Sequence, residues 1–150
     1  MARRRFLVQM ATWPLAALVP ITTFPEPRSA SLKIVLKSAW GSDDPTKAAF
    51  PFSHANALSE AGHAVQIFLL GEAVGLMRRS VAEAVVPVGW PPVGELLGKV
   101  AARKIPIYAC GTCSRARGVV EADLANWGAK FGSPPIFVSL VEWADHIITE

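Results

Sequence analysis

The sequence predicts a three-layer α/β domain, in which helices cover both faces of a mostly parallel sheet of about five strands. From residue 31 onwards, short apolar runs alternate with longer amphipathic segments, a pattern typical of parallel β-α-β units. Hydrophobic residues make up 51% of the chain, which is enough for a core without disulfide bonds. Since no repeat or low-complexity linker interrupts the pattern, we expect residues 31–150 to form a single domain.

The first half of this domain contains two predicted strands and one long helix. Residues 32–39 and 63–70 are short and apolar, as buried strands are. Between them, residues 45–61 predict a helix that begins after a Ser-Asp-Asp run suited to capping and ends at Gly62. Pro51 removes one backbone hydrogen bond inside this helix, so we expect a kink or a later start.

The middle of the domain is less regular. Residues 73–79 predict a short helix, and residues 83–89 predict a brief strand or a loop. Leucine and valine recur at helical spacing in residues 92–104, which indicates an amphipathic helix. Residues 105–109 (IPIYA) are again short and apolar, and they predict the next strand.

The last third continues the alternation. Apolar residues in segment 114–127 are spaced for one buried face, so we expect one helix there. After a turn rich in glycine and proline, residues 137–145 predict another helix. Residues 146–149 (HIIT) predict a final short strand.

The charge of the chain is concentrated at its N-terminus. The net charge is +3, and residues 1–30 hold four arginines against a single glutamate. Residues 31–150 therefore carry eleven basic and eleven acidic side chains, which leaves no excess positive charge to attract a phosphate backbone. The composition excludes nucleic acid as an expected partner.

Residues 1–30 have the layout of an export signal: a basic start, an uncharged run over 6–25, then a polar stretch. Arg3–Leu7 resembles the twin-arginine consensus, which would imply export of the folded protein. The alternatives are an N-terminal arm or a misassigned start. We therefore expect a periplasmic or exported location if the segment is a signal, with only transient membrane contact, and a cytoplasmic location otherwise.

Three loops are expected to meet at one edge of the sheet, because ligands bind where parallel strands end. They are residues 40–44, 71–72 and 110–113. The candidate cleft residues they bring together are Cys110 and Cys113 with Trp40, Asp43, Asp44, Glu72, Gly111, Thr112 and Arg115. The aspartates are more often helix caps than acids or bases. Glu72 is either a proton relay or a surface carboxylate. We expect Trp40 and Trp90 to cover the cleft or a subunit interface, or else to be buried in the core.

The two cysteines are the most reactive residues of this set. Cys110 lies where its strand stops, and Cys113 lies at the start of the following helix. Unpaired backbone N–H groups, the helix dipole and Arg115 all favour the thiolate there, and the thiolate is the nucleophile. The alternative is that both are small buried hydrophobic residues.

Two other interpretations of the cysteine pair fail. Cys-Gly-Thr-Cys has the spacing of a thioredoxin motif, but only 37 residues follow Cys113, too few for the rest of that fold. A zinc site needs three or four ligands, and His54, His63 and His146 lack ligand spacing with the cysteines. His63 and His146 open strands and are expected to be structural. We expect no metal and no cofactor.

The sequence resembles the DsrE/DsrF-like family, which includes Tus-type sulfur-relay subunits. The resemblance spans residues 32–150 and rests on five segments in order: KIVLKSAWGSDDPTKA, GHAVQIFLLGEAV, PPVGELLGKV, IYACGTCSRARGV and LVEWADHIITE. It implies a Rossmann-like fold, assembly as a homotrimer, homohexamer or mixed ring, and a persulfide on the cysteine that corresponds to Cys110.

The resulting hypothesis is a sulfurtransferase-like carrier that forms a persulfide on Cys110 and passes the sulfur from a donor to a partner thiol. Cys113 departs from the simplest relay pattern and would either resolve the persulfide, with formation of a disulfide, or protect Cys110 from over-oxidation. The alternatives are a non-catalytic partner-binding subunit and a Cys-x-x-Cys dithiol oxidoreductase. An exported protein would find its donor and acceptor outside the cytoplasm.

Overall fold

The structure is a computed structural model, and it describes residues 30–150. The signal or arm predicted for residues 1–30 lies, but for Ala30, outside the described residues. Of the helices in the described part, none is both long and apolar enough to cross a membrane.

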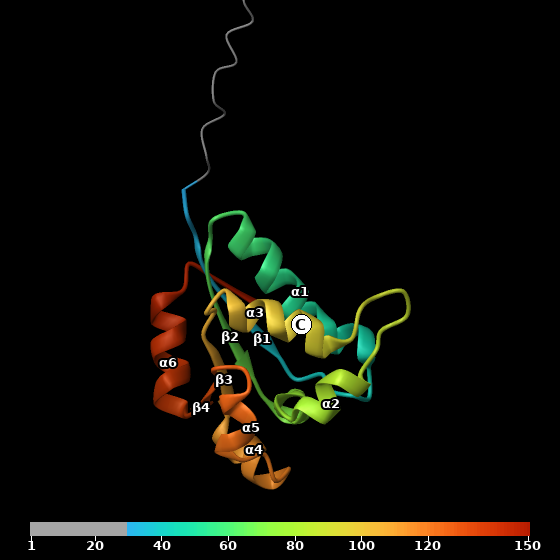
Figure 1. The fold of residues 1–150 in the computed structure, drawn as a ribbon. Helices are drawn as coiled ribbons and strands as arrows, with labels where there is room; N and C mark the ends of the chain where they lie inside the picture. The colour runs from blue at the N-terminus through green and yellow to red at the C-terminus, as the bar shows by residue number, and fades with distance from the viewer. Residues whose placement is uncertain (1–29) are drawn as a thin grey trace, which may run out of the picture.

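A five-stranded sheet forms the middle layer (Figure 1). Its strands lie in the order β4-β3-β2-β1-β5, and every neighbouring pair is parallel. The strands are β1 (Lys33–Ser38), β2 (Ala64–Leu69), β3 (Ile107–Cys110), β4 (Lys130–Gly132) and β5 (His146–Thr149). The predicted α/β fold with a mostly parallel sheet is thus confirmed.

Helices cover both faces of the sheet. They are α1 (Pro45–Glu60), the 3₁₀ helix η1 (Gly71–Met77), α2 (Arg79–Ala84), α3 (Val93–Ala102), α4 (Gly111–Ala116), α5 (Glu121–Ala125) and α6 (Pro134–Trp143). In Figure 1, α1 and α3 lie on one side of the strands and α6 lies on the other, while α4 and α5 lie at the end where the strands finish.

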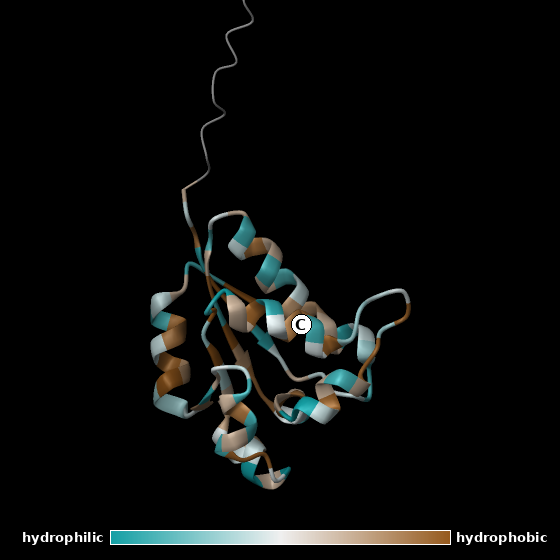
Figure 2. Ribbon diagram, in the orientation of Figure 1, coloured by the Kyte–Doolittle hydropathy of each residue, from teal (hydrophilic) through white to brown (hydrophobic). Residues whose placement is uncertain are grey.

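Alternation along the strands divides the core in two, because successive side chains point to opposite faces. Ile34, Leu36, Ile67 and Ile107 belong to the larger cluster, which packs under α1 and α3. A smaller cluster packs against α6 and consists of Val35, Phe68 and Leu140 with partly buried neighbours. Figure 2 shows hydrophobic residues along the strands and a mixture of polar and hydrophobic residues on the helices that flank them. The three central strands, β1, β2 and β3, therefore contribute to both cores.

The first predicted helix is confirmed, but the prediction that it starts later, because of Pro51, is wrong. Helix α1 begins at Pro45 and continues through Pro51. Asp44 caps it, accepting a hydrogen bond from the backbone N–H of Lys47 at 3.0 Å, and proline is well suited to the first helical turn. The hydrogen bond lost at Pro51 is tolerated because Ala48 and Phe52 are fully buried, and packing overrides the local preference.

The helix predicted for residues 114–127 is wrong, since two short helices, α4 and α5, occupy this segment. They are separated at Gly118, whose φ of 63° lies in the left-handed region that glycine adopts without steric cost. Strand β4 was not predicted; its three residues are too few to show a period. Helix α6 begins at Pro134, earlier than residue 137, because Ser133 caps it.

In the middle of the chain, the helix predicted for residues 73–79 is the 3₁₀ helix η1, and α2 follows directly. Residues 83–89 form the end of α2 and a loop, so the loop alternative holds there.

Candidate cysteine site at the carboxyl edge of the sheet

Cys110 is the last residue of β3, and its strand position sets the direction of its side chain. Tyr108 and Cys110 share one face of the strand and contact the smaller core cluster beneath α6, and Cys110 also packs against the larger cluster. Cys113 lies in the first turn of α4 and packs only against the larger cluster. Both thiols are free and half-buried. Both cysteines thus contact the larger cluster, and Cys110 alone of the two also contacts the smaller one.

The environment of Cys110 favours the thiolate. Burial raises the pKa of Cys110. Four neighbouring groups lower it by more than burial raises it: the amide and thiol of Cys113, the amide of Thr112 and the charge of Arg115. The pKa of Cys110 therefore lies below the ordinary thiol value. Helix α4 has only six residues, so individual N–H groups act here more than a long helix dipole. Cys110 is therefore the stronger candidate nucleophile.

An open cavity of about 440 Å³ adjoins Cys110. It lies between the ends of β1, β2 and β3, the start of α4 and the start of α6. Its lining residues are Lys37, Phe68, Leu70, Cys110, Gly111, Thr112, Arg115, Gly132, Ser133, Pro134 and Phe137. This volume is typical of sites for small molecules, so the thiol of Cys110 is accessible to a ligand of that size.

Glycine at position 132 makes room for one wall of the cavity. Gly132 pairs with Cys110 across β3 and β4, and a Cβ atom there would lie 2.7 Å from the ring of Phe68. That ring lies 5.1 Å from the ring of Phe137, centroid to centroid, at a tilt of 53°. Any larger residue at 132 would push the Phe68 ring out of place.

Three of the other predicted cleft residues lie with Cys110. Gly111, Thr112 and Arg115 line the cavity, and Arg115 donates a hydrogen bond to the Thr112 hydroxyl at 3.2 Å. Cys113 lies behind them and does not line it.

The loop after β1 contributes caps and not cavity walls. Asp44 caps α1 and forms an ion pair with Lys47 at 3.0 Å, so the pKa of Asp44 is lowered, mainly by its hydrogen bond from the Lys47 backbone. Asp43 accepts a hydrogen bond from the N–H of Gly41. The exposed Trp40 lies under the Lys47 ammonium, 3.9 Å from ring centroid to nitrogen. These residues lie outside the cavity.

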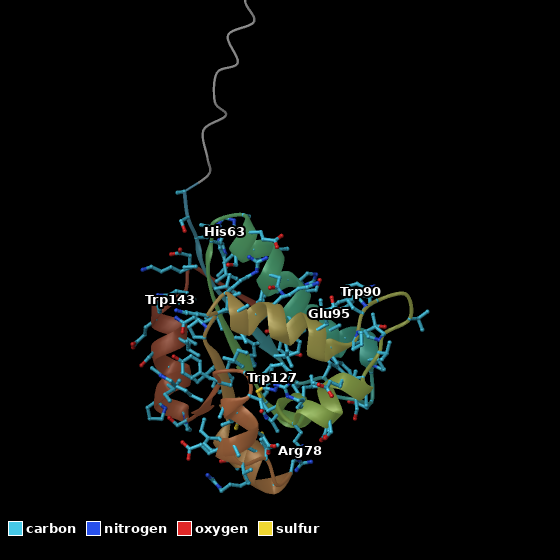
Figure 3. The ribbon with its side chains drawn as sticks, viewed as in Figure 1. His63, Arg78, Trp90, Glu95, Trp127 and Trp143 are labelled. Atoms are coloured by element: carbon cyan, nitrogen blue, oxygen red, sulfur yellow. The ribbon has the colours of Figure 1, made fainter. Side chains whose placement is uncertain are left out.

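Glu72 is connected to the cysteine loop through Arg117. Arg117 donates two hydrogen bonds to Glu72 and one to the backbone oxygen of Cys113 at 3.3 Å. The hydrogen bond from Arg117 lowers the pKa of Glu72, which favours the carboxylate form of this side chain. Arg78, labelled in Figure 3, donates to the backbone oxygen of Arg117.

The loops after β1 and β2 touch, as the topology predicts. A Cβ atom on Gly41 would lie 2.7 Å from the backbone oxygen of Glu72, and the N–H of Ala73 donates to the oxygen of Ala39 at 3.2 Å. The three predicted loops therefore adjoin one another, but only the cysteine loop reaches the cavity.

The remaining candidates lie elsewhere. His63 accepts a hydrogen bond from the N–H of Leu32, a structural role, and His146 pairs with Ile34 at the start of β5. The imidazole of His54 contacts the carboxylate of Glu150. Trp90 is half-buried against Phe50. Within residues 30–150, no three His, Cys, Asp or Glu side chains cluster in a way that suits a metal ion.

Sequence reasoning missed the far walls of the cavity. Lys37, Phe68 and Phe137 come from β1, β2 and α6. One signal was visible: Lys37 is a charged residue near the carboxyl end of a buried strand, where ligands bind. The aromatic residues gave no such signal, because core burial explains them equally well.

The fold and site define a class: an α/β protein with a parallel sheet and an accessible cysteine at the strand ends. A sequence model of the DsrE/DsrF-like family matches residues 34–149. The chain belongs to the DsrE/DsrF-like family, as its motifs suggest.

Solved structures share this fold. The ychN protein from E. coli matches with a TM-score of 0.63 and 18% identity, over 80% of this chain and 99% of that one. MTH1491 from Methanobacterium thermoautotrophicum, titled a protein of unknown function, matches with a TM-score of 0.57 and 17% identity, over 80% and 100%. BT1422 from Bacteroides thetaiotaomicron, titled likewise, matches with a TM-score of 0.52 and 17% identity, over 79% and 94%. No curated protein matches the chain.

Proposed function

We propose that this protein is a sulfur carrier that forms a persulfide on Cys110 and transfers the sulfur to a partner thiol. The observation that carries the proposal is the position of Cys110: its thiol lines an open cavity, and neighbouring N–H groups and Arg115 lower its pKa. Membership of the DsrE/DsrF-like family supports it, because sulfur relay is common among these proteins.

The chemistry needs no cofactor. The Cys110 thiolate attacks the outer sulfur of a donor R–S–SH, the donor S–S bond breaks, and R–S⁻ leaves with the electron pair. Cys110 then carries –S–SH. In the second step, an acceptor thiolate attacks the outer sulfur, and Cys110 leaves as the thiolate. Sulfur is transferred without net oxidation in either step.

Cys113 offers a second route, because its thiol is near enough to Cys110 to lower the pKa of Cys110. If the Cys113 thiolate attacked the inner sulfur of the persulfide, hydrosulfide would leave and a Cys110–Cys113 disulfide would form. The two cysteines would then be oxidised by two electrons, and the outer sulfur would be reduced to sulfide. This route makes the protein a sulfur reductase until a thiol reductant restores the dithiol.

Intact mass after incubation of the full chain with polysulfide or thiosulfate tests the proposal. We expect a gain of one or more sulfur atoms that is lost in Cys110→Ser and kept in Cys113→Ser. A loss of two hydrogens that needs both cysteines would favour a dithiol oxidoreductase instead. If neither cysteine reacts, the proposal fails, and a partner-binding subunit with structural cysteines remains.

A further inference from the structure

The cavity beside Cys110 has apolar walls. Phe68, Leu70, Pro134 and Phe137 form its sides, and the two aromatic rings pack at a tilt against each other. Soft, polarisable sulfur makes favourable contacts with aromatic rings. The walls therefore suit an apolar group or a sulfur chain better than a fully hydrated ion.

Among residues 30–150, the only charged side chains that line the cavity are cationic. They are Lys37, whose ammonium lies 5.8 Å from the centre of the Phe137 ring, and Arg115. Within residues 30–150, neither of these side chains forms an ion pair. The two positive charges are therefore available for a ligand anion, and the pairing of an apolar body with an anionic group matches both features of the cavity.

The two cations also lie close to the reacting atom. Lys37 follows Val35 on the face of β1 that α6 covers, the face that Cys110 shares on β3. Arg115 lies one helical turn beyond Gly111 and contributes to the low pKa of Cys110. An anion held between Lys37 and Arg115 would thus lie beside the thiol.

We propose that the cavity binds a small organic sulfur anion, with its apolar body against Phe68 and Phe137 and its charge between Lys37 and Arg115. The class that fits is an organic thiosulfonate, R–SO₂–S⁻, which serves as the sulfur donor. The inference rests on the proposed function, because Cys110 is the atom that receives the sulfur.

The transfer step balances for this donor. The Cys110 thiolate attacks the terminal sulfur of R–SO₂–S⁻, a Cys110–S–S⁻ persulfide forms, and the bond between the terminal sulfur and the sulfonyl sulfur breaks. The electron pair leaves with the sulfinate, R–SO₂⁻, which retains its charge next to Lys37 and Arg115. No external oxidant or reductant is needed.

Titration calorimetry of the wild-type full chain with benzenesulfonate measures binding separately from sulfur transfer. Benzenesulfonate has the apolar ring and the anionic group of the proposed donor, but it has no sulfur atom that Cys110 could accept. We expect benzenesulfonate to bind at least about tenfold more tightly than methanesulfonate, because the ring buries apolar surface. Lys37→Gln is expected to weaken the binding of benzenesulfonate several-fold. The matched control Lys33→Gln changes an exposed lysine at the other end of the same strand and leaves binding unaltered.

Transfer is measured by the rate at which Cys110 gains sulfur from benzenethiosulfonate, methanethiosulfonate and thiosulfate. The inference predicts a saturable rate with benzenethiosulfonate and the highest efficiency for it. Equal binding of benzenesulfonate and methanesulfonate, or equal sensitivity to Lys37→Gln and Lys33→Gln, overturns the inference while the polysulfide reaction still tests the proposed function. If benzenesulfonate binds selectively but Cys110 gains sulfur from no donor, the proposed function fails, while the binding of an apolar organic anion in the cavity is still supported.

Discussion

At the scale of the residue, the chemistry of Cys110 depends on a few short contacts. Cys110 is the last residue of β3, so the first turn of α4 follows it directly, and the amides of Thr112 and Cys113 in that turn lower the pKa of its thiol. The Cys113 thiol lowers the pKa of Cys110 further. The second cysteine therefore influences the first even in a reaction in which it forms no covalent bond.

This contact predicts the pH dependence of Cys110 alkylation. The rate of iodoacetamide labelling of Cys110 in wild type should rise with pH through a pKa below the ordinary thiol value, since only the thiolate reacts. In Cys113→Ala the thiol that helps to lower the pKa of Cys110 is removed, so the thiolate is less stable, the profile moves to higher pH and labelling at neutral pH slows several-fold. Peptide mass spectrometry follows the labelling. Cys113→Ser keeps a donor and should stay closer to wild type; identical profiles for Cys113→Ala and wild type would contradict the contact.

A second residue-scale prediction concerns Gly41, where the loops after β1 and β2 approach each other. In Gly41→Ala the added Cβ meets the backbone oxygen of Glu72 at 2.7 Å, so one of the loops must shift. We expect a loss of about 1–3 kcal/mol of unfolding free energy, the usual effect of overpacking. Urea denaturation measures it. An unchanged midpoint would mean that the loops separate freely.

At the scale of the element, the break between α4 and α5 depends on Gly118. Its positive φ turns the chain after α4 and lets Val119 enter the core. A continuous helix over this segment would carry the residues after Gly118 in another direction, and Val119 would leave its buried position.

Gly118→Ala should therefore destabilise the protein by about 1–2 kcal/mol, the cost of a left-handed conformation for a residue with a Cβ. Gly98→Ala is the matched control: Gly98 lies inside α3, where an added Cβ meets nothing within 4 Å. It should raise stability by about 0.5–1 kcal/mol, since alanine favours the helix. Thermal unfolding of both variants checks the sign. Equal shifts in the same direction would rule out a special role for Gly118.

At the scale of the whole molecule, the edge strand β5 is exposed on both faces, with Ile147 and Ile148 at its surface. Val138 and Val141 are exposed on α6. Unpaired strand edges and apolar surface are typical of association sites. Together with the family resemblance, they favour assembly from copies of this chain.

We expect light scattering of the purified full chain to give the mass of a homotrimer or homohexamer. Ile148→Lys places a charge on the exposed edge and should shift the mass toward the monomer, because burying an unpaired charge at an interface is costly. Lys130→Arg on the opposite edge strand, β4, preserves the charge and is the control. A monomer at micromolar concentration in wild type would contradict the expectation.

The sequence by itself determined the class of fold and the position of the reactive group. Short apolar runs separated by helical segments require a parallel sheet, and Cys110 at the end of such a run must lie at the ligand-binding edge. Asp44 as a helix cap and His63 as a structural residue were also predictable, because both make local or strand-end contacts.

Only the tertiary structure decided which side chains surround Cys110. Alternation along a strand indicates which residues share a face, but not which helix covers that face. Lys37, Phe68 and Phe137 are distant in sequence, and they meet only because α6 packs across β1 and β2. The three-residue strand β4 is likewise held by its pairing with β3, a long-range interaction that a three-residue run cannot encode.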